Sequence, residues 1–161
     1  MNPIIISAGL GVATHIITSI GFTALLNTAS SITNTSQNVY KILQTMSSSD
    51  AEITKEISQL DFEATIKVLN ELIKKIELDE NDAALSECVQ SLRDIIFKIE
   101  GELNKIHKIL EYNNDIWFMK KFRKYDCLDS LNKLKTYKKI LDSRMKLMKE
   151  ITKIERCMNK N

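Results

Sequence analysis

Apolar residues recur at alternating spacings of four and three residues between positions 85 and 110 of this chain. This spacing places an apolar stripe along one α-helix and is typical of a long helix packed against others at a shallow angle. We call the stripe the 85–110 seam; it consists of Leu85, Val89, Leu92, Ile96, Ile99, Leu103, Ile106 and Leu110. The chain has one Pro and four Gly in 161 residues, and no segment reads as a pair of β-strands. The sequence therefore predicts an all-α protein.

The N-terminal 40 residues contain no Asp, Glu, Lys or Arg; Lys41 is the first charged residue and Asp50 the second. Within this head (residues 1–46), residues 4–27 are long enough to cross a hydrocarbon layer, for which about 20 apolar residues suffice. We expect the head to be retained, because it lacks a positive n-region and a clear small-residue cleavage site. Its interior also contains small and polar residues, which suit a bundle helix equally: Gly9, Gly11, Thr14, His15, Thr18, Ser19, Gly21 and Thr23. Three interpretations remain open: a core helix of a bundle, a permanent membrane anchor, or an element that a bundle releases into a membrane.

The pattern predicts a first helix from about Pro3 to about Asn27, which resumes after a kink and continues to Met46. A capping box at Ser49–Glu52 begins the next helix, and the acidic stretch 77–82 is a turn. That helix presents an apolar stripe with a break near Asp61, formed by Ile53, Ile57, Leu60, Phe62, Ile66, Leu69, Ile73 and Ile76. The seam helix ends at residues 112–115.

The last helix is expected over Tyr125–Met158, with Tyr137 and Ile140 broadening its buried face. Its inward residues are predicted to be Leu128, Leu131, Leu134, Leu141, Met145, Met148 and Ile151. The fold prediction is one domain, residues 1–161: an antiparallel up-and-down bundle of four or five helices with an apolar N-terminal helix. The head spans 1–46, and charged amphipathic helices span 49–158.

Charge is distributed unevenly along the chain. Residues 51–100 hold 6 basic and 12 acidic residues, whereas residues 101–161 hold 16 basic and 8 acidic ones. This gradient favours pairing of oppositely charged helices, or alternatively a basic surface that faces an anionic partner. Cys88, Cys127 and Cys157 show no metal-binding spacing, which predicts reduced thiols and an intracellular location, cytoplasmic or membrane-associated.

No constellation of catalytic residues is recognisable. His15 and His107 belong to different helices and have no nucleophile or carboxylate pair at a catalytic spacing. The sequence also lacks a P-loop, a zinc-finger spacing and an EF-hand loop. We therefore expect no enzymatic activity, no cofactor and no metal, and we expect no nucleic-acid binding because no reading motif is present.

Aromatic and basic residues are interleaved between positions 117 and 124. This segment suits an anionic membrane surface, with aromatic rings at the headgroup level and cations beside the lipid phosphates. The alternative is that Trp117, Phe118 and Phe122 close one end of the bundle while the cations are solvated. The candidates for contact with lipid headgroups are Trp117, Lys120, Lys121, Arg123 and Lys124.

The order of these features resembles the fungal HeLo and HeLo-like domains. The resemblance rests on the apolar Gly/Ala/Ser-rich first helix and on three runs, residues 91–110, 116–121 and 128–134. HeLo-like domains begin many fungal cell-death and NOD-like proteins, and the four-helix domains of mixed lineage kinase domain-like protein and of plant helper immune receptors are related in logic. The resemblance implies a helical bundle that oligomerises and damages a membrane through its first helix and a basic surface.

By this resemblance the first helix is the membrane-active element. Its insertion candidates are Ile4, Ile5, Ile6, Leu10, Val12, Ile16, Ile17, Ile20, Phe22, Leu25 and Leu26. First helices of the family often carry an acidic residue, whereas this head has none, which puts pore lining in doubt and favours an anchor. An upstream sensor is expected to be a separate protein.

The leading functional expectation is a non-enzymatic bundle that oligomerises and inserts into, or permeabilises, a membrane. The alternative is a structural, scaffold or membrane-anchored protein, for example a small component of a large DNA virus particle, in a homo-oligomer or larger assembly. A third interpretation is an adaptor that binds a partner helix along the 85–110 seam.

Overall fold

The computed structural model describes the backbone of residues 7–46, 51–75, 83–113 and 120–158. Side chains are described for residues 23–46, 51–75, 83–112, 126–154 and 157. The helices are α1 (Ser7–Met46), α2 (Ala51–Ser58), α3 (Phe62–Lys75), α4 (Ala83–Asn113) and α5 (Lys120–Met158). Every described residue outside the short α2–α3 bend is helical, so the all-α prediction is confirmed. The capping residues Ser49 and Asp50 and the predicted turn at 77–82 lie outside the described residues.

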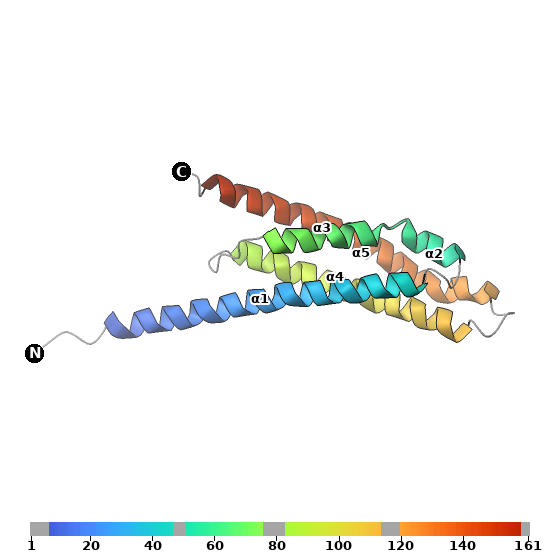
Figure 1. Cartoon of the computed structure of the whole chain (residues 1–161), viewed down its shortest axis with the longest axis horizontal. Helices are drawn as coiled ribbons and strands as arrows, with labels where there is room; N and C mark the ends of the chain where they lie inside the picture. Colours follow the sequence, from blue (N-terminus) through green and yellow to red (C-terminus); the bar gives the residue numbers. More distant parts are fainter. Residues whose placement is uncertain (1–6, 47–50, 76–82, 114–119, 159–161) are drawn as a thin grey trace, which may run out of the picture.

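Helix α4 is the central element of a four-helix bundle in which α2 and α3 follow one another and together take the place of one helix (Figure 1). Its largest contacts are with α5 and α1, and smaller contacts join α3 to α1 and both α2 and α3 to α5. Figure 1 shows α1 and α4 running in the same direction, whereas α3 and α5 run in the opposite one. The direction therefore alternates from α1 to α3, α4 and α5, and α1 and α4, which contact each other, pack as parallel neighbours.

All eight residues of the 85–110 seam are buried, none more than 1% exposed. A second row on α4, seven residues apart, is also buried and consists of Cys88, Ile95 and Glu102. Together the two rows form a stripe wide enough to contact both α1 and α5, which explains why the most regular helix of the sequence occupies the centre. Because α1 and α5 cover this stripe, the seam offers no free surface to a partner helix in this conformation.

Helix α1 is continuous through the Ser/Thr-rich stretch, so the predicted kink after Asn27 is absent. The hydroxyls of Thr28 and Thr33 donate to the carbonyl oxygens of Ala24 and Ala29, 2.8 and 3.3 Å away, and thus bond within their own helix. One buried row keeps the four-three spacing throughout and consists of Leu25, Thr28, Ile32, Thr35, Val39, Ile42 and Met46, and Ala29 and Ser36 are buried beside it. Regular packing against α4 therefore outweighs the modest helix propensity of the polar residues.

The predicted break near Asp61 is confirmed. Helix α2 ends at Ser58, and the Asp61 amide donates to the Ser58 carbonyl over 3.1 Å. Asp61 has a φ of 49°, the left-handed conformation that Asp tolerates better than most residues. The chain then turns into α3 with Phe62 buried, so the apolar stripe continues across the bend.

Helix α5 begins at Lys120, five residues before the predicted start at Tyr125. Leu128, predicted to face inward, is 43% exposed, and Ile140 is also exposed. The buried spacing instead passes through Cys127, Leu131, Leu134, Leu141, Met145 and Met148. Leu128 follows Cys127 by one residue and is therefore rotated by about 100° away from the core face. Tyr137 and Ile151 pack partly buried against the core, as expected.

Candidate functional site

The first part of α1 extends past the end of the bundle. Asn38 of α1 contacts Glu100 of α4, with Nδ2 donating to Oε1 over 3.0 Å, and this pair aligns the two parallel helices. The first residue of α4, Ala83, is 17 residues before Glu100, and the residue 17 before Asn38 is Gly21. Residues 7–21, which we call the arm, therefore precede the level at which α4 begins. Figure 1 shows this end of α1 projecting beyond the other helices.

The composition of the arm differs from that of the buried face of α1. Extending the buried four-three spacing of α1 toward its start gives small or hydroxyl-bearing residues only: Gly21, Thr18, Thr14, Gly11 and Ser7. None of them has enough apolar area to anchor another helix, since burial contributes about 25 cal/mol per Å². The larger apolar residues of the arm occupy other positions. The head thus divides into a core segment from Leu25 to Met46 and the arm.

The predicted membrane-insertion residues fall into four groups. Leu10, Val12, Ile16, Ile17, Ile20 and Phe22 lie in the helical backbone of the arm or next to it, and Ile4, Ile5 and Ile6 lie outside the described residues. Leu25 is buried in the core, 5% exposed, and is therefore unavailable to a membrane in this conformation. Leu26, one residue later, is 44% exposed.

The predicted lipid-headgroup residues do not lie near the arm. Lys120, Lys121, Arg123 and Lys124 belong to the start of α5, and Trp117 lies outside the described part of the chain. Figure 1 places the start of α5 and the arm at opposite ends of the bundle. The length of α1 alone, 40 residues, corresponds to about 60 Å at the usual helical rise. The structure therefore does not bring these two predicted elements together.

A different set of cations lies at the arm's end of the bundle, where α5 ends (Figure 1). Lys146, Lys149 and Lys153 are exposed there, together with the apolar side chains of Leu147 and Ile154. We call these three lysines the arm-end lysines. Sequence reasoning registered the basic C-terminal third but missed these residues, because only the direction of α5 shows which end of the bundle they share.

One charged side chain is buried at the α4–α5 contact. Glu102 accepts hydrogen bonds from Ser130 of α5 at 2.7 Å and from Lys105 at 2.8 Å. Burial by itself would raise the pKa of Glu102, but the hydrogen bonds from Lys105 and Ser130 and the positive charges of Lys105 and Lys133 outweigh it and lower that pKa. The carboxylate therefore stays ionised and connects the two helices, a structural role.

Among the residues whose side chains are described, ion pairs that bridge the acidic and basic parts of the chain are few. Lys135 of α5 contacts Glu56 of α2 over 3.0 Å, as the pairing hypothesis requires. Other pairs, such as Lys138–Asp142 and Lys74–Glu71, lie within one helix. Much of the positive charge of α5 therefore faces solvent.

The remaining chemically reactive groups are three free thiols and two histidines. Cys88 and Cys127 are buried free thiols and Cys157 is an exposed one; burial raises the pKa of Cys88, although Arg144 opposes this. His107 lies 3.4 Å from Glu111 on the same helix, and the side chain of His15 lies outside the described ones. Among the described residues, no three His, Cys, Asp or Glu side chains are grouped so that they could hold a metal ion.

In the part of the chain that the structure describes, no helix combines the length and the apolar character needed to span a membrane. Comparison of the chain with protein-family models, curated proteins and solved structures finds no match.

Proposed function

We propose that this chain is a non-enzymatic helical bundle that acts at membranes through its N-terminal arm, in the manner of the HeLo-like domains it resembles. The single observation that carries the proposal is the arm itself, an uncharged helical segment that precedes the level at which α4 begins. A segment without charge avoids the free-energy cost of placing ions in hydrocarbon. This cost is on the order of 3 kcal/mol for each Asp, Lys or Arg at the centre of a membrane-spanning helix.

The arm is too short to cross a bilayer without the core segment. Residues 7–21 correspond to about 22 Å of helix, whereas the hydrocarbon core is about 30 Å thick. The free arm therefore inserts part way, and a full crossing draws in residues as far as Asn27. This step takes Leu25 out of the core and leaves a destabilising cavity there, so the bundle restrains complete insertion.

The arm-end lysines complete the proposed membrane-facing end. Each Lys beside an anionic surface contributes about 1 kcal/mol, and the attraction falls off within a Debye length, about 8–10 Å. Lys146, Lys149 and Lys153 lie at the end of the bundle that an inserted arm brings to the surface. The start of α5 lies at the other end of the bundle and is, in this geometry, farther from the bilayer.

The test is leakage of a fluorescent dye from vesicles of mixed zwitterionic and anionic lipid. We expect the full chain to release dye, and a variant lacking residues 1–21 to be inactive while retaining its helical circular dichroism. An Ile17→Asp variant places a charge in the arm and should also lose leakage. The matched control, Phe97→Asp, changes an exposed apolar residue of α4 and should leak normally. Equal leakage by the truncated and full chains would overturn the proposal.

A scaffold function is the second candidate. The small residues of the arm, Ser7, Gly11, Thr14, Thr18 and Gly21, share one face and allow another helix to approach closely. In this alternative the arms of several copies pack on one another without lipid. Light scattering of the purified chain distinguishes the two: ordered oligomers that disappear on deletion of residues 1–21 support the scaffold, and a monomer excludes it.

A further inference from the structure

Helix α5 carries a second row of apolar residues beside the row that it buries in the core. This outer row alternates steps of three and four residues and consists of Tyr137, Ile140, Arg144, Leu147, Ile151 and Ile154. Ile140, Arg144 and Leu147 each precede a buried residue by one position, so the outer row is rotated by about 100° around α5. With one exception its residues are apolar, and it thus repeats the pattern of a helix that packs against another helix.

The helices that the structure describes do not cover the outer row. Tyr137 and Ile151 pack partly buried against the core, whereas Ile140, Leu147 and Ile154 are 37%, 47% and 57% exposed. Helix α5 makes its main contacts with α4 and smaller ones with α2 and α3, and Figure 1 shows its C-terminal part at the edge of the bundle. One side of α5 therefore has the spacing of a packed helix and remains exposed.

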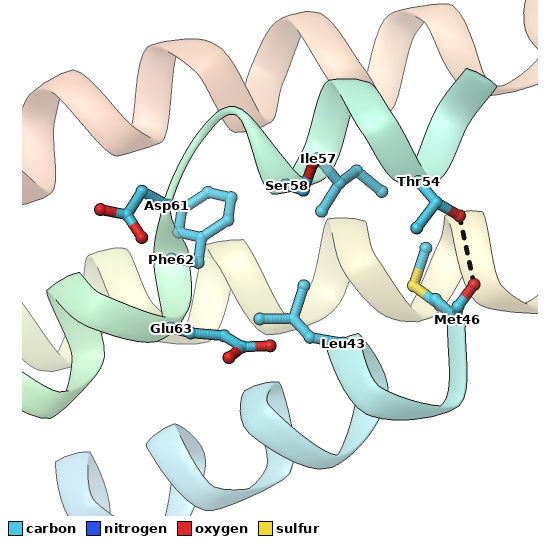
Figure 2. Close-up of a pocket in the computed structure, with 8 residues that line it drawn as sticks. All are labelled: Leu43, Met46, Thr54, Ile57, Ser58, Asp61, Phe62 and Glu63. Atoms are coloured by element: carbon cyan, nitrogen blue, oxygen red, sulfur yellow. Dashed lines mark hydrogen bonds between the residues drawn. The ribbon is translucent and has the colours of Figure 1, made fainter. Parts of the chain in front are cut away.

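Two hollows of similar volume differ in how they are built. One, of about 310 Å³, lies between the end of α1 and the α2–α3 bend, where Leu43, Ile57 and Phe62 converge from three helices (Figure 2). The other, of about 350 Å³, is a depression in the surface of α5 and is lined by Lys139, Ile140, Ser143, Arg144 and Leu147. All residues of the second hollow are exposed on one helix, so a side chain of a partner can enter it from solvent.

The surface around the outer row is basic. Residues 137–154 contain six basic and two acidic residues. Three exposed lysines recur every seven residues, each one position before an exposed apolar residue of the row: Lys139, Lys146 and Lys153. Among the described side chains neither these lysines nor Arg144 form an ion pair, whereas Lys138 of the same helix pairs with Asp142. The charge beside the row is therefore available to carboxylates of a partner.

We propose that the outer row binds an acidic amphipathic helix of a partner protein. The apolar residues of that helix pack against the three exposed apolar residues of the row, and its carboxylates face Arg144 and the neighbouring lysines. The spacing specifies a helix, because a narrow row with alternating steps of three and four fits a second helix at a shallow angle. A helix that lies on a membrane surface needs a broader apolar face.

Charge specifies the acidity of the partner, since complementary potentials favour association. A symmetric contact between two copies of this chain brings the same patch of each copy together. The basic surface would then face itself, which disfavours a second copy as the occupant.

This inference does not depend on the proposed membrane function, although the two share residues. Lys146 and Lys153 belong both to the arm-end lysines and to the surface beside the outer row. A bound partner helix therefore neutralises charge that the proposed function uses at an anionic membrane.

Binding of two synthetic peptides to the full chain tests the proposal. Both peptides contain three heptads with Leu at positions a and d and Ala at b, c and f. One has Glu at e and g and the other has Lys, so that repulsion keeps each from pairing with itself. We expect saturable binding of the Glu peptide by fluorescence anisotropy, and binding of the Lys peptide at least about tenfold weaker. Equal binding of the two peptides, or no binding of the Glu peptide, would overturn the proposal.

Nuclear magnetic resonance of the ¹⁵N-labelled full chain locates the bound peptide. The Glu peptide should shift the amide signals of Ile140, Leu147 and Ile154. Shifts confined to the cavity between α1 and the α2–α3 bend (Figure 2) would refute the assignment.

Variants separate the apolar contact from the charge. Leu147→Gln removes apolar area without changing charge and should weaken binding of the Glu peptide about tenfold. Phe97→Gln makes the same kind of change at an exposed site of α4, and this matched control should bind as the parent does. Arg144→Gln together with Lys146→Gln should weaken binding of the Glu peptide about fivefold, a typical effect for exposed charge pairs. Undiminished binding by the Leu147 variant, with its circular dichroism preserved, contradicts the proposal.

The same variant identifies the two other occupants. Loss of binding to anionic vesicles by Leu147→Gln, with no binding of the Glu peptide to the parent, would make the outer row a membrane surface. A dimer of the parent in light scattering that Leu147→Gln dissociates would show that a second copy covers the row. Either result would replace the proposed partner helix.

Discussion

The side-chain amide of Asn38 donates to the carboxylate of Glu100 over 3.0 Å and joins two helices that run in the same direction. This pair aligns the start of α4 with Gly21 and leaves residues 7–21 ahead of it. Parallel neighbours need a long connection between them, which here is formed by α2 and α3. The arm is therefore a consequence of helix length, because α1, with 40 residues, is longer than its parallel neighbour α4, with 31.

The two lysine groups of α5 are predicted to differ in their effect on vesicle binding. Replacing Lys146, Lys149 and Lys153 by Gln should weaken binding to anionic vesicles by up to about a hundredfold, at about 1 kcal/mol for each Lys. The same replacement at Lys120, Lys121 and Lys124 removes equal charge from the other end and should change binding by less than about threefold. Co-sedimentation at fixed ionic strength measures both, and an equal loss in the two triple variants would refute this orientation.

Glu102 is predicted to make stability depend on pH. Its pKa is lower in the folded than in the unfolded chain, so its carboxylate stabilises the fold above the unfolded value of about 4.3. That stabilisation is lost as the pH falls through the folded pKa. Glu102→Gln should therefore flatten the acid side of the stability profile relative to the parent.

Removal of the Glu102 side chain is expected to cost about 2 kcal/mol at pH 7, because Ser130 is left buried without its acceptor. Ser130→Ala should cost less, about 1 kcal/mol. Urea unfolding of the single and double variants gives the coupling energy directly. Strictly additive effects would show that the hydrogen bond contributes nothing to the α4–α5 contact.

Gly101→Ala is predicted to stabilise the protein. Gly101 is exposed within α4, and a Cβ added there meets nothing within 4 Å. The substitution should therefore yield nearly the full helix-propensity difference, about 1 kcal/mol, and raise the Tm by about 2–4 °C. Differential scanning calorimetry measures the change. An unchanged or lower Tm would indicate that a partner or another copy lies against this face.

Leu128 and Leu131 provide a matched pair on one helix. Leu131 is fully buried, so Leu131→Ala should cost about 2–5 kcal/mol through lost burial and a new cavity. Leu128→Ala removes the same atoms from an exposed site and should change stability by less than about 1 kcal/mol. Equal losses on thermal unfolding would mean that Leu128 is covered in solution.

The presence of the helices and most of the core residues could be predicted from the spacing of apolar residues along the chain. The 85–110 seam, the break at Asp61 and the stripe of α3 were predicted because each face buries one continuous apolar row. The phase of α5 was wrong at Leu128 because its core row passes through Cys127, and Lys138 interrupts the row. A Leu one position away from a Cys is the more conspicuous apolar residue, although only the Cys is buried.

The sequence by itself determined that the chain is helical, that the 85–110 seam is packed against other helices and that the first 40 residues are uncharged. These properties are local, since they depend on spacing and residue type along one helix. Tertiary structure alone decided that α1 and α4 are parallel neighbours, that the arm extends past the bundle, and that it shares an end with Lys146, Lys149 and Lys153. The reason is physical: an apolar stripe indicates which face of a helix is buried, but it contains no information about the direction of the helix that covers that face.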